Sequence, residues 1–213
     1  AVICGKIYKN ISFIYDIRGD VAAEYLYYAK QKGITEKEIK RELIREKAIQ
    51  TAIGRQAEKV FTVSEVLKRR MIDDYNYDSE KIIVIPCLAD SNIFCFSRRL
   101  RDEFRKKLDV SDKYVIVYPG AIGYWHYSDT VFQTAGGILN QFSEVFFLIL
   151  TPQTNEAREY ASKYLPQGRY FITSAKREEV PGYLNASDLG FLLREQHDLN
   201  RVAAPTKFAE YMM

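Results

Sequence analysis

Residues 203–210 (AAPTKFAE) hold a combination of side chains that suits a diphosphate. Pro205 fits the first position of a helix, where its missing N–H is not needed. The N–H groups that follow, the Thr206 hydroxyl and the Lys207 ammonium can all meet phosphate oxygens. Glu210 comes about one turn later, where a carboxylate can accept hydrogen bonds from a ribose diol. A surface helix with an ordinary Lys–Glu pair is the competing interpretation.

Two further segments have the character of ligand-binding loops. The first is residues 119–123 (PGAIG), where Gly120 and Gly123 let the backbone come close to a ligand. The second is residues 174–176 (SAK), which ends in Lys176 and can offer backbone groups to a base. Each of these segments is equally compatible with a plain turn between a strand and a helix.

Charged and aromatic side chains elsewhere are weaker candidates. Asp16 and Arg18 end a predicted strand, at the edge where parallel sheets bind ligands, although an ion pair that fixes the loop explains them equally well. Trp125 can stack on a sugar and His126 can donate a hydrogen bond, but a lone Trp is more often packed in a core. The basic run 68–70 (KRR) suits a membrane surface or, by default, a solvated helix face.

The composition is that of an ordinary globular protein. Of the 213 residues, 47% are hydrophobic and 28% are charged, and the net charge is +3. That charge is too small to indicate nucleic acid, so we expect no nucleic-acid partner. The longest apolar run, residues 145–150, is far shorter than the roughly 20 residues that cross a bilayer, and no signal peptide is evident.

The cysteines and histidines argue against disulfides and metals. Cys4, Cys87 and Cys95 are odd in number and widely spaced, which favours a reducing, cytoplasmic compartment. No pair of cysteines has metal-ligand spacing, and only His126 and His197 could complete a site. We therefore expect neither a metal nor a cofactor.

Alternating apolar and amphipathic runs predict two series of strands and helices. In the first series, Thr35 and Glu38 form a capping box for a long helix that ends near Ala57. Ser64 caps the next helix, which extends to about Tyr75. The strands of this series are predicted at residues 12–17, 59–63 and 81–86.

The second series follows residues 86–97, which lack periodicity and are predicted to link two sheets. A strongly basic helix, residues 97–108, comes first. Strands are then predicted at residues 114–118, 145–150, 170–173 and 189–193, and helices at residues 129–141, 155–164, 178–185 and from about Pro205.

Continuous apolar strands between helices predict parallel sheets covered on both faces. Two such series predict an α/β fold with two Rossmann-like, doubly wound domains, which we place at residues 1–96 and 97–213. The first series has only about three strands, and no strand follows the last helix. We therefore expect both domains to be incomplete, with the sequence cut at both ends.

The order of these motifs resembles the retaining GT-B glycosyltransferases of family four, also called glycosyltransferase group 1. Residues 46–96, with "AEKVFTVSEVLKRRM" and "KIIVIPCLADSNIF", are similar to the stretch that joins the two domains of that family. "FIYDIRGD" resembles an earlier strand end, and "VIVYPGAIGYWH" resembles the first strand and glycine loop of the donor domain. "REEVPGYLNASDLGFLLR" and "NRVAAPTKFAEYMM" resemble later parts of that domain. The resemblance covers nearly the whole chain.

The resemblance implies a metal-independent glycosyltransferase that moves a sugar from a nucleotide sugar to an acceptor hydroxyl with retention. The donor domain would hold the nucleotide, with Gly120 near the diphosphate and Glu210 on the ribose. The implied nucleotide-sugar-binding residues are Gly120, Ala121, Lys176, Arg201, Ala204, Thr206, Lys207 and Glu210. The implied catalytic residues are Asp16, Arg18 and Lys207.

Three positions depart from the family pattern. The first Glu of a Glu-x7-Glu pair falls on Val202, so Glu195 or Asp198 would have to replace it. The usual phosphate-loop Ser is Ala204. Residues 121–127 also lack the Arg and Lys that usually neutralise the diphosphate.

Positive charge would then come from Arg201 and Lys207, which would stabilise the departing nucleoside diphosphate. The acceptor hydroxyl would attack from the same face, and the leaving phosphate would take its proton. Closure of the two domains would exclude water and reduce hydrolysis.

The implied partners are a nucleotide sugar and a glycan or lipid-linked acceptor, as in the synthesis of a surface polysaccharide or glycoconjugate. Peripheral contact with the inner face of the cytoplasmic membrane is left open.

Two alternative functions remain. A GT-B-type sugar-nucleotide epimerase would need catalytic carboxylates and a His in the cleft. A truncated GT-B piece could instead serve as a non-catalytic binding module.

Overall fold

The computed structural model describes residues 12–123 and 127–213, which form two compact units. The first comprises residues 1–87 and 196–205, and the second comprises residues 88–195 and 206–213. The expected boundary between residues 96 and 97 lies inside the second unit. The reason is the side chain of Asn185, which donates to Cys95 O (3.1 Å) and accepts from Ser97 N–H (2.6 Å), so this part of the linker is held by the second unit.

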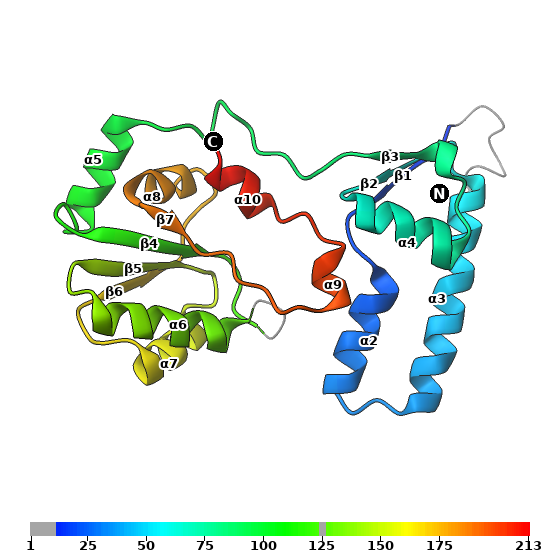
Figure 1. Cartoon of the computed structure of the whole chain (residues 1–213), viewed down its shortest axis with the longest axis horizontal. Helices are drawn as coiled ribbons and strands as arrows, with labels where there is room; N and C mark the ends of the chain where they lie inside the picture. Colours follow the sequence, from blue (N-terminus) through cyan, green and yellow to red (C-terminus); the bar gives the residue numbers. More distant parts are fainter. Residues whose placement is uncertain (1–11, 124–126) are drawn as a thin grey trace. The chain divides into compact units, whose positions relative to one another are not determined.

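The first unit contains a three-stranded parallel sheet in the order β1-β2-β3 (Figure 1). The three predicted strands are confirmed, each within two residues at either end. The elements are β1 (Ile14–Ile17), α2 (Val21–Gln31), α3 (Glu36–Gln56), β2 (Lys59–Thr62), α4 (Glu65–Tyr75), the 3-10 turn η1 (Ser79–Lys81), β3 (Ile82–Val84) and α9 (Asp198–Arg201). The short helix α9 was not predicted.

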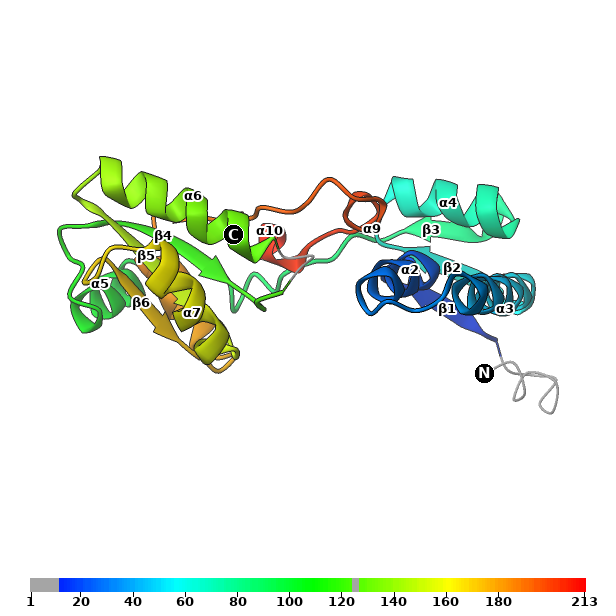
Figure 2. The same cartoon turned by 90° about the horizontal axis from the view of Figure 1, so that it is seen from below.

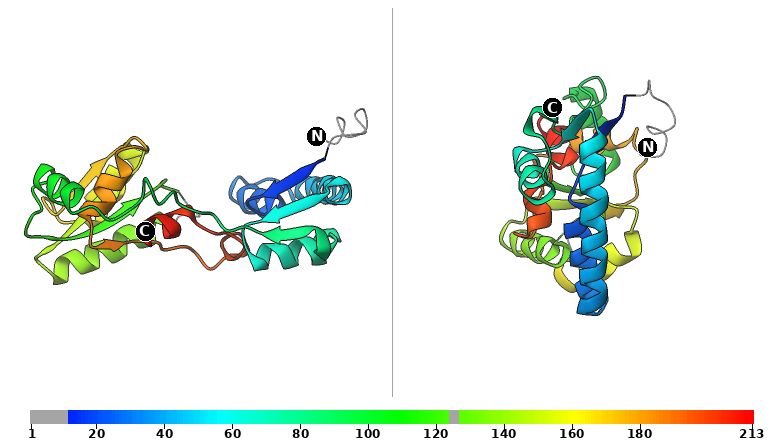
Figure 3. Two further views of the ribbon diagram at one scale, coloured as in Figure 1. Left: turned by 90° about the horizontal axis from the view of Figure 1, so that it is seen from above. Right: turned by 90° about the vertical axis from the view of Figure 1, so that its right-hand side faces the viewer.

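Side-chain caps begin the helices of the first unit, as expected. Thr35 Oγ1 accepts from Glu38 N–H, and a Glu38 carboxylate oxygen accepts from Thr35 N–H at 3.3 Å, which confirms the capping box. Ser64 Oγ accepts from Leu67 N–H at 3.1 Å at the start of α4. These contacts satisfy N–H groups that the first turn of a helix leaves unpaired. Figure 3 shows α3 as one uninterrupted helix.

Within the described residues, one face of the first sheet is better covered than the other. Side chains alternate between the faces of a strand, and the face that includes Val60 and Ile82 packs against Leu67 and Met71 of α4. Figure 2 shows α4 lying along one side of the strands. Most residues of the opposite face are exposed, with 52% of Ile14 and 43% of Ile83 accessible to solvent, although Phe61 is half-buried. Among the described residues, the helical cover of this sheet therefore lies mainly on the face of α4.

Residues 196–205 belong to the first unit although they follow the last strand of the second unit in sequence. Val202 is fully buried in the core around α4, and its carbonyl accepts a 2.7 Å hydrogen bond from Ser64 Oγ. An ion pair of 3.8 Å joins Arg70 to Asp198. Apolar burial and these two polar contacts hold the segment in place.

The second unit contains a four-stranded parallel sheet in the order β6-β5-β4-β7. Its strands and helices agree with the predicted series, apart from the length of the last strand. The elements are α5 (Arg98–Lys107), β4 (Tyr114–Pro119), α6 (Ser128–Gln141), β5 (Val145–Leu150), α7 (Thr154–Tyr164), β6 (Tyr170–Thr173), α8 (Val180–Ala186), β7 (Leu189–Gly190) and α10 (Thr206–Tyr211).

Helices cover both faces of this second sheet. Ile116, Phe147 and Ile149 pack toward α6 and α7, whereas Val115 and Leu148 face α5 and α8. In Figure 1, α5 and α8 lie above the strands and α6 and α7 lie below them. The sheet is thus the middle layer of three, as the continuous apolar strands predicted.

The last strand is shorter than predicted, ending at Gly190 rather than near residue 193. Phe191 N–H still donates to Val117 O, but Phe191 O accepts from the Tyr211 hydroxyl at 3.1 Å. The carbonyl of the residue that follows the strand therefore pairs with an α10 side chain.

None of the helices within the described residues combines the length and the apolar character that a membrane span requires.

Asp188 joins α5 to the sheet of the second unit. Its carboxylate accepts from Arg101 Nη2 at 2.5 Å, from Arg105 Nη1 at 3.1 Å and from Val115 N–H at 2.8 Å. Burial alone would raise the pKa of Asp188, but the hydrogen bond from Val115 and the two arginines lower it. Arg105 is itself buried and also donates to Ala186 O at 2.9 Å.

We expect Asp188→Ala to lower the free energy of unfolding by about 2–4 kcal/mol, because it leaves the buried guanidinium of Arg105 without a counterion. The measurement is urea unfolding followed by circular dichroism. Asp112→Ala is the matched control, since Asp112 is exposed and forms a surface ion pair of 3.5 Å with its neighbour Lys113. Equal effects of the two substitutions would contradict the assigned role of Asp188.

Candidate functional site

The carboxyl ends of β4, β5 and β6 surround a pocket of about 310 Å³ in the second unit. Ligands of parallel α/β sheets bind at this edge, and the volume lies at the lower end of the range for small-molecule sites. The walls include Gly120, Ser174, Ala175, Arg177, Lys207 and Glu210. The three segments singled out in the sequence therefore contribute to one pocket. Whether they bind a nucleotide stays a prediction.

Gly120 gives Lys207 the space to enter the pocket wall. The backbone of Gly120 has φ +143°, which only glycine adopts readily. A Cβ atom at this position would overlap with the ammonium group of Lys207. The close approach expected of Gly120 thus occurs, but toward a lysine side chain of the same unit.

The glycine loop has fewer backbone N–H groups available to a ligand than its sequence suggests. Gly120 N–H donates to Leu150 O at 2.7 Å. Ile122 N–H donates to the Gln153 side chain at 2.8 Å, and Gly123 N–H donates to Ser128 Oγ at 3.0 Å. Since three N–H groups of the loop are already bonded within the protein, a bound anion has to be held mainly by side chains.

Among the cations that line the pocket, Lys207 has the most strongly shifted pKa. Its Nζ lies 4.9 Å from the ring centroid of Tyr118, a cation–π arrangement. Burial, together with the nearby Arg194, lowers the pKa of Lys207 to about 8, while Glu210 opposes the shift. An anion bound beside Lys207 would stabilise the charged form that burial disfavours.

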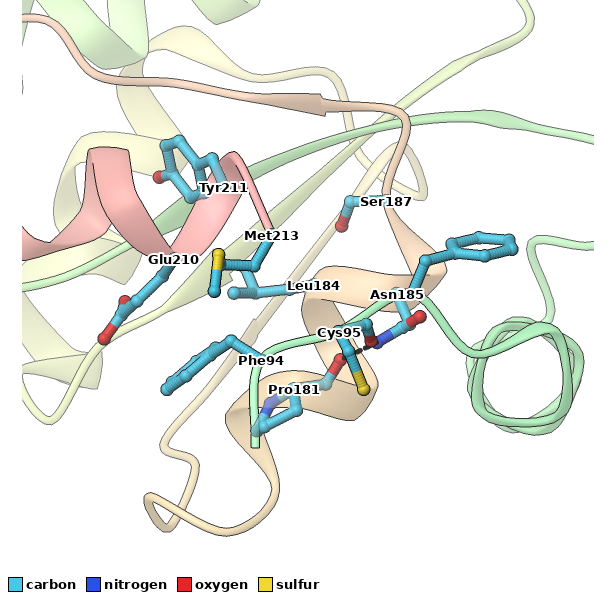
Figure 4. Close-up of a pocket in the computed structure, with 10 residues that line it drawn as sticks. Phe94, Cys95, Pro181, Leu184, Asn185, Ser187, Glu210, Tyr211 and Met213 are labelled. Carbon is cyan, nitrogen blue, oxygen red and sulfur yellow. Dashed lines mark hydrogen bonds between the residues drawn. The ribbon is translucent and has the colours of Figure 1, made fainter. Parts of the chain in front are cut away.

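Glu210 lies one turn after Lys207 and also lines a second pocket of about 230 Å³. Burial raises the pKa of Glu210, and Arg177 and Lys207 partly offset this effect. Figure 4 shows Glu210 on α10 near Phe94, whose side chain borders both pockets. The carboxylate therefore stands between two recesses and can accept hydrogen bonds from a polar ligand in either.

Tyr211 fixes the position of this end of α10. Its hydroxyl bonds to Phe191 O, and its ring packs so closely on Gly190 that a Cβ atom there would lie 2.6 Å from the ring. Gly190 thus lets α10 lie against the sheet, which places Lys207 and Glu210 in the pocket wall.

The other residues predicted in this unit lie at the margin of the pocket. Thr206 is exposed at the start of α10, which has only six residues. Lys176 is also exposed, and its N–H donates to the Glu179 carboxylate at 3.0 Å. Ala121 accepts a 2.9 Å hydrogen bond from the Tyr118 hydroxyl through its carbonyl. The structure places Arg177, rather than Lys176, in the pocket wall.

Two arginines of the site were missed in the sequence. Arg177 follows directly after Lys176 and acts electrostatically on Glu210. Arg194 follows β7, is half-buried, and acts electrostatically on Lys207 and Tyr118. A charged residue shortly after a strand was the signal that pointed to Arg18, and the same signal would have found Arg194.

Four of the predicted site residues belong to the first unit, namely Asp16, Arg18, Arg201 and Ala204. Arg201 is exposed and lies 4.0 Å from Asp198, and Ala204 packs at the margin of the core around α4. Arg201 is therefore not part of the pocket in the second unit. Arg177, which lines that pocket, and Arg194, which acts electrostatically on Lys207, provide positive charge near it.

Asp16 and Arg18 form an exposed ion pair of 2.8 Å at the end of β1. The hydrogen bond from Arg18 to Asp16 raises the pKa of the guanidinium, and Arg18 also contacts Cys87 Sγ at 3.7 Å. The interpretation that this pair fixes the loop agrees with the geometry. A catalytic role for it stays a prediction.

Two further predictions concern a pair of loop residues and the absence of a metal. Trp125 and His126 lie outside them. Within residues 12–123 and 127–213, no group of three or more His, Cys, Asp or Glu side chains could hold a metal ion. The metal-independent chemistry implied by the resemblance stays a prediction.

Comparison with known proteins gives structural but no sequence-level matches. No protein-family model and no curated protein matches the chain. HepE (Alr3699) of Anabaena, solved with UDP-glucose, matches with a TM-score of 0.62 and 15% identity over 89% of this chain and 48% of that chain. A glycosyltransferase from Rickettsia africae matches with a TM-score of 0.57 and 18% identity over 89% of this chain and 52% of that one.

A third match is WaaG, a glycosyltransferase involved in lipopolysaccharide biosynthesis, with a TM-score of 0.60 and 12% identity over 86% of this chain and 50% of that chain. The chain thus spans about half the length of the solved structures that it matches. At these identities the likeness concerns the fold, which agrees with the α/β architecture predicted from the sequence. The chain therefore has the GT-B fold of these glycosyltransferases, with parallel Rossmann-like sheets.

Proposed function

We propose that the second unit binds the nucleoside diphosphate of a nucleotide sugar, and that the protein transfers the sugar to an acceptor hydroxyl. The observation that carries this proposal is the pocket in which Gly120, Lys207 and Glu210 meet. A partly buried ammonium beside a carboxylate at the carboxyl ends of parallel strands suits a phosphate next to a ribose. HepE, which shares the fold, was solved in complex with UDP-glucose, and this makes UDP and its sugars the first ligands to test.

The proposed chemistry rests on electrostatic stabilisation of the leaving group. As the bond between sugar and phosphate breaks, negative charge grows on the diphosphate. Lys207, with Arg194 nearby, would stabilise that charge, and their partial burial strengthens the interaction. Arg177 would supply further positive charge beside Glu210.

Retention of configuration follows from the resemblance to family four and is part of the proposal. The acceptor hydroxyl would attack on the face that the diphosphate leaves, and a phosphate oxygen would accept its proton. We propose a glycan or a lipid-linked glycan as acceptor, and cytoplasmic synthesis of a surface polysaccharide or glycoconjugate as the setting.

We expect the chain to bind UDP or a UDP-sugar at micromolar concentration in isothermal titration calorimetry. Glu210→Ala should weaken this binding about tenfold or more, roughly 1.4 kcal/mol, because the ribose loses an acceptor. Glu103→Ala is the control, since Glu103 is exposed on α5 and should leave affinity unchanged. Equal affinities for all three proteins would refute the assignment of Glu210.

The products of the full-length protein separate transfer from its alternatives. Incubation with the nucleotide sugar and a glycan acceptor should release the nucleoside diphosphate and lengthen the acceptor. A free isomerised nucleotide sugar as product would identify an epimerase instead. Tight binding without turnover would identify a binding module.

We also expect the affinity for UDP to fall as pH rises from 7 to 9. Because the pKa of Lys207 in the free protein is about 8, the ammonium that attracts the diphosphate is lost over this interval. Calorimetry at pH 8 in buffers of different ionisation enthalpy should show net proton uptake on binding. Lys207→Arg, which keeps its charge, should remove most of the pH dependence, and a pH profile shared by both proteins would contradict the role of Lys207.

A further inference from the structure

An open apolar groove of about 570 Å³ lies between α2 and α3 of the first unit. The two helices lie side by side and are joined by a short loop (Figure 1). Leu26, Ile34, Ile39, Leu43 and Ile44 provide its apolar surface. Ile44 remains 63% exposed, so a substantial apolar surface faces solvent. Such a surface, bordered by charged groups, is typical of an interaction site.

The α3 side of the groove is a single stripe of side chains. The residues are Glu36, Ile39, Lys40, Leu43, Ile44 and Lys47, and we call them the α3 stripe. Intervals of three and four residues place them on one face of the helix. At about 1.5 Å per residue, the stripe is about 16 Å long.

The positions of the α3 stripe are spaced symmetrically about its centre, and its two ends carry opposite charges. It begins with an acid, Glu36, and ends with a base, Lys47. Ile39 and Ile44 occupy equivalent places on either side of the centre. When two such stripes lie antiparallel around a two-fold axis, Glu36 of each copy faces Lys47 of the other, and the isoleucines meet between them. A two-fold interface requires this kind of self-complementary surface.

We propose that the protein forms a homodimer in which two α2–α3 hairpins pair through antiparallel α3 stripes. Lys40 faces Leu43 of the second copy in this arrangement. The aliphatic stem of Lys40 can cover that leucine, while its ammonium stays within one turn of Glu36. The four helices then share one apolar centre, as in small helix bundles.

The pairing of Glu36 with Lys47 favours a second copy over a purely anionic surface. An anionic membrane would attract Lys30, Lys40 and Lys47 of the groove but would repel Glu36, and α3 carries four acids beside its six bases. Helices that bind membranes at the interface instead combine a wide apolar face with a largely basic polar face. Because the stripe is short, the interface is small, and we expect dissociation in the micromolar range.

Charge exchange tests the pairing directly, by sedimentation velocity on the whole chain. Glu36→Lys alone and Lys47→Glu alone should each weaken dimerisation at least about tenfold, because each places like charges in contact twice. An equimolar mixture of the two variants should recover the dimer, since every contact then joins opposite charges. The double variant should also dimerise like the original protein.

Apolar substitutions provide the matched control. Ile44→Ser should abolish the dimer, whereas Ile49→Ser, on the same helix at 40% exposure but outside the groove, should leave it intact. Circular dichroism checks that each variant is folded. A monomer at all concentrations up to about 100 µM, or a mixture of charge variants that stays monomeric, would overturn the proposal. Binding to vesicles of phosphatidylglycerol that Glu36→Lys strengthens, without a dimer in solution, would assign the groove to a membrane and overturn it as well.

Discussion

The packing of Lys207 against Gly120 is the contact on which the arrangement of the site depends. A long cationic side chain enters the pocket wall only because position 120 lacks a Cβ atom. There the ammonium lies over the ring of Tyr118 and loses hydration, which lowers its pKa. A cation that has lost water and gained little compensating charge binds an anion more strongly than one in bulk solvent. The same contact fixes how α10 meets the end of β4.

The fold supports this contact from two sides. Gly190 lets the ring of Tyr211 lie against β7, so the helix that carries Lys207 and Glu210 is held on the sheet. On the other side, Asp188 holds α5 to the start of β4 through two arginines. Both contacts act within the second unit, so the pocket is organised by a single sheet and the layers that cover it.

Local signals in the sequence predicted the elements well. The capping box of Thr35, the Ser64 cap and the apolar run of residues 145–150 each depend on neighbours in the chain, and all three are confirmed. The predicted length of β7 was wrong, since the strand ends at Gly190 and the carbonyl of Phe191 accepts from the Tyr211 hydroxyl, a group that is distant in sequence. The exposed face around Ile14 was missed for the same kind of reason, since periodicity does not show what covers a strand.

The positions of charges were the harder part of the site. The sequence pointed to Lys176 and Arg201 as cations, but the turn after β6 directs Arg177 to the pocket, and the burial of Val202 keeps Arg201 with the first unit. Arg194 could have been found from its place shortly after a strand. The sequence could not show that the N–H groups of the glycine loop are already bonded, because their partners Gln153 and Ser128 come from other segments.

The central claim is that the pocket at the end of β4 holds a diphosphate, and a crystal structure of the chain with UDP tests it most directly. The account predicts density for the diphosphate within about 3 Å of Lys207 Nζ, as expected for a charge-assisted hydrogen bond, with the ribose hydroxyls on Glu210. Density for UDP elsewhere, with Lys207 still packed over Tyr118 and no phosphate beside it, would contradict the account.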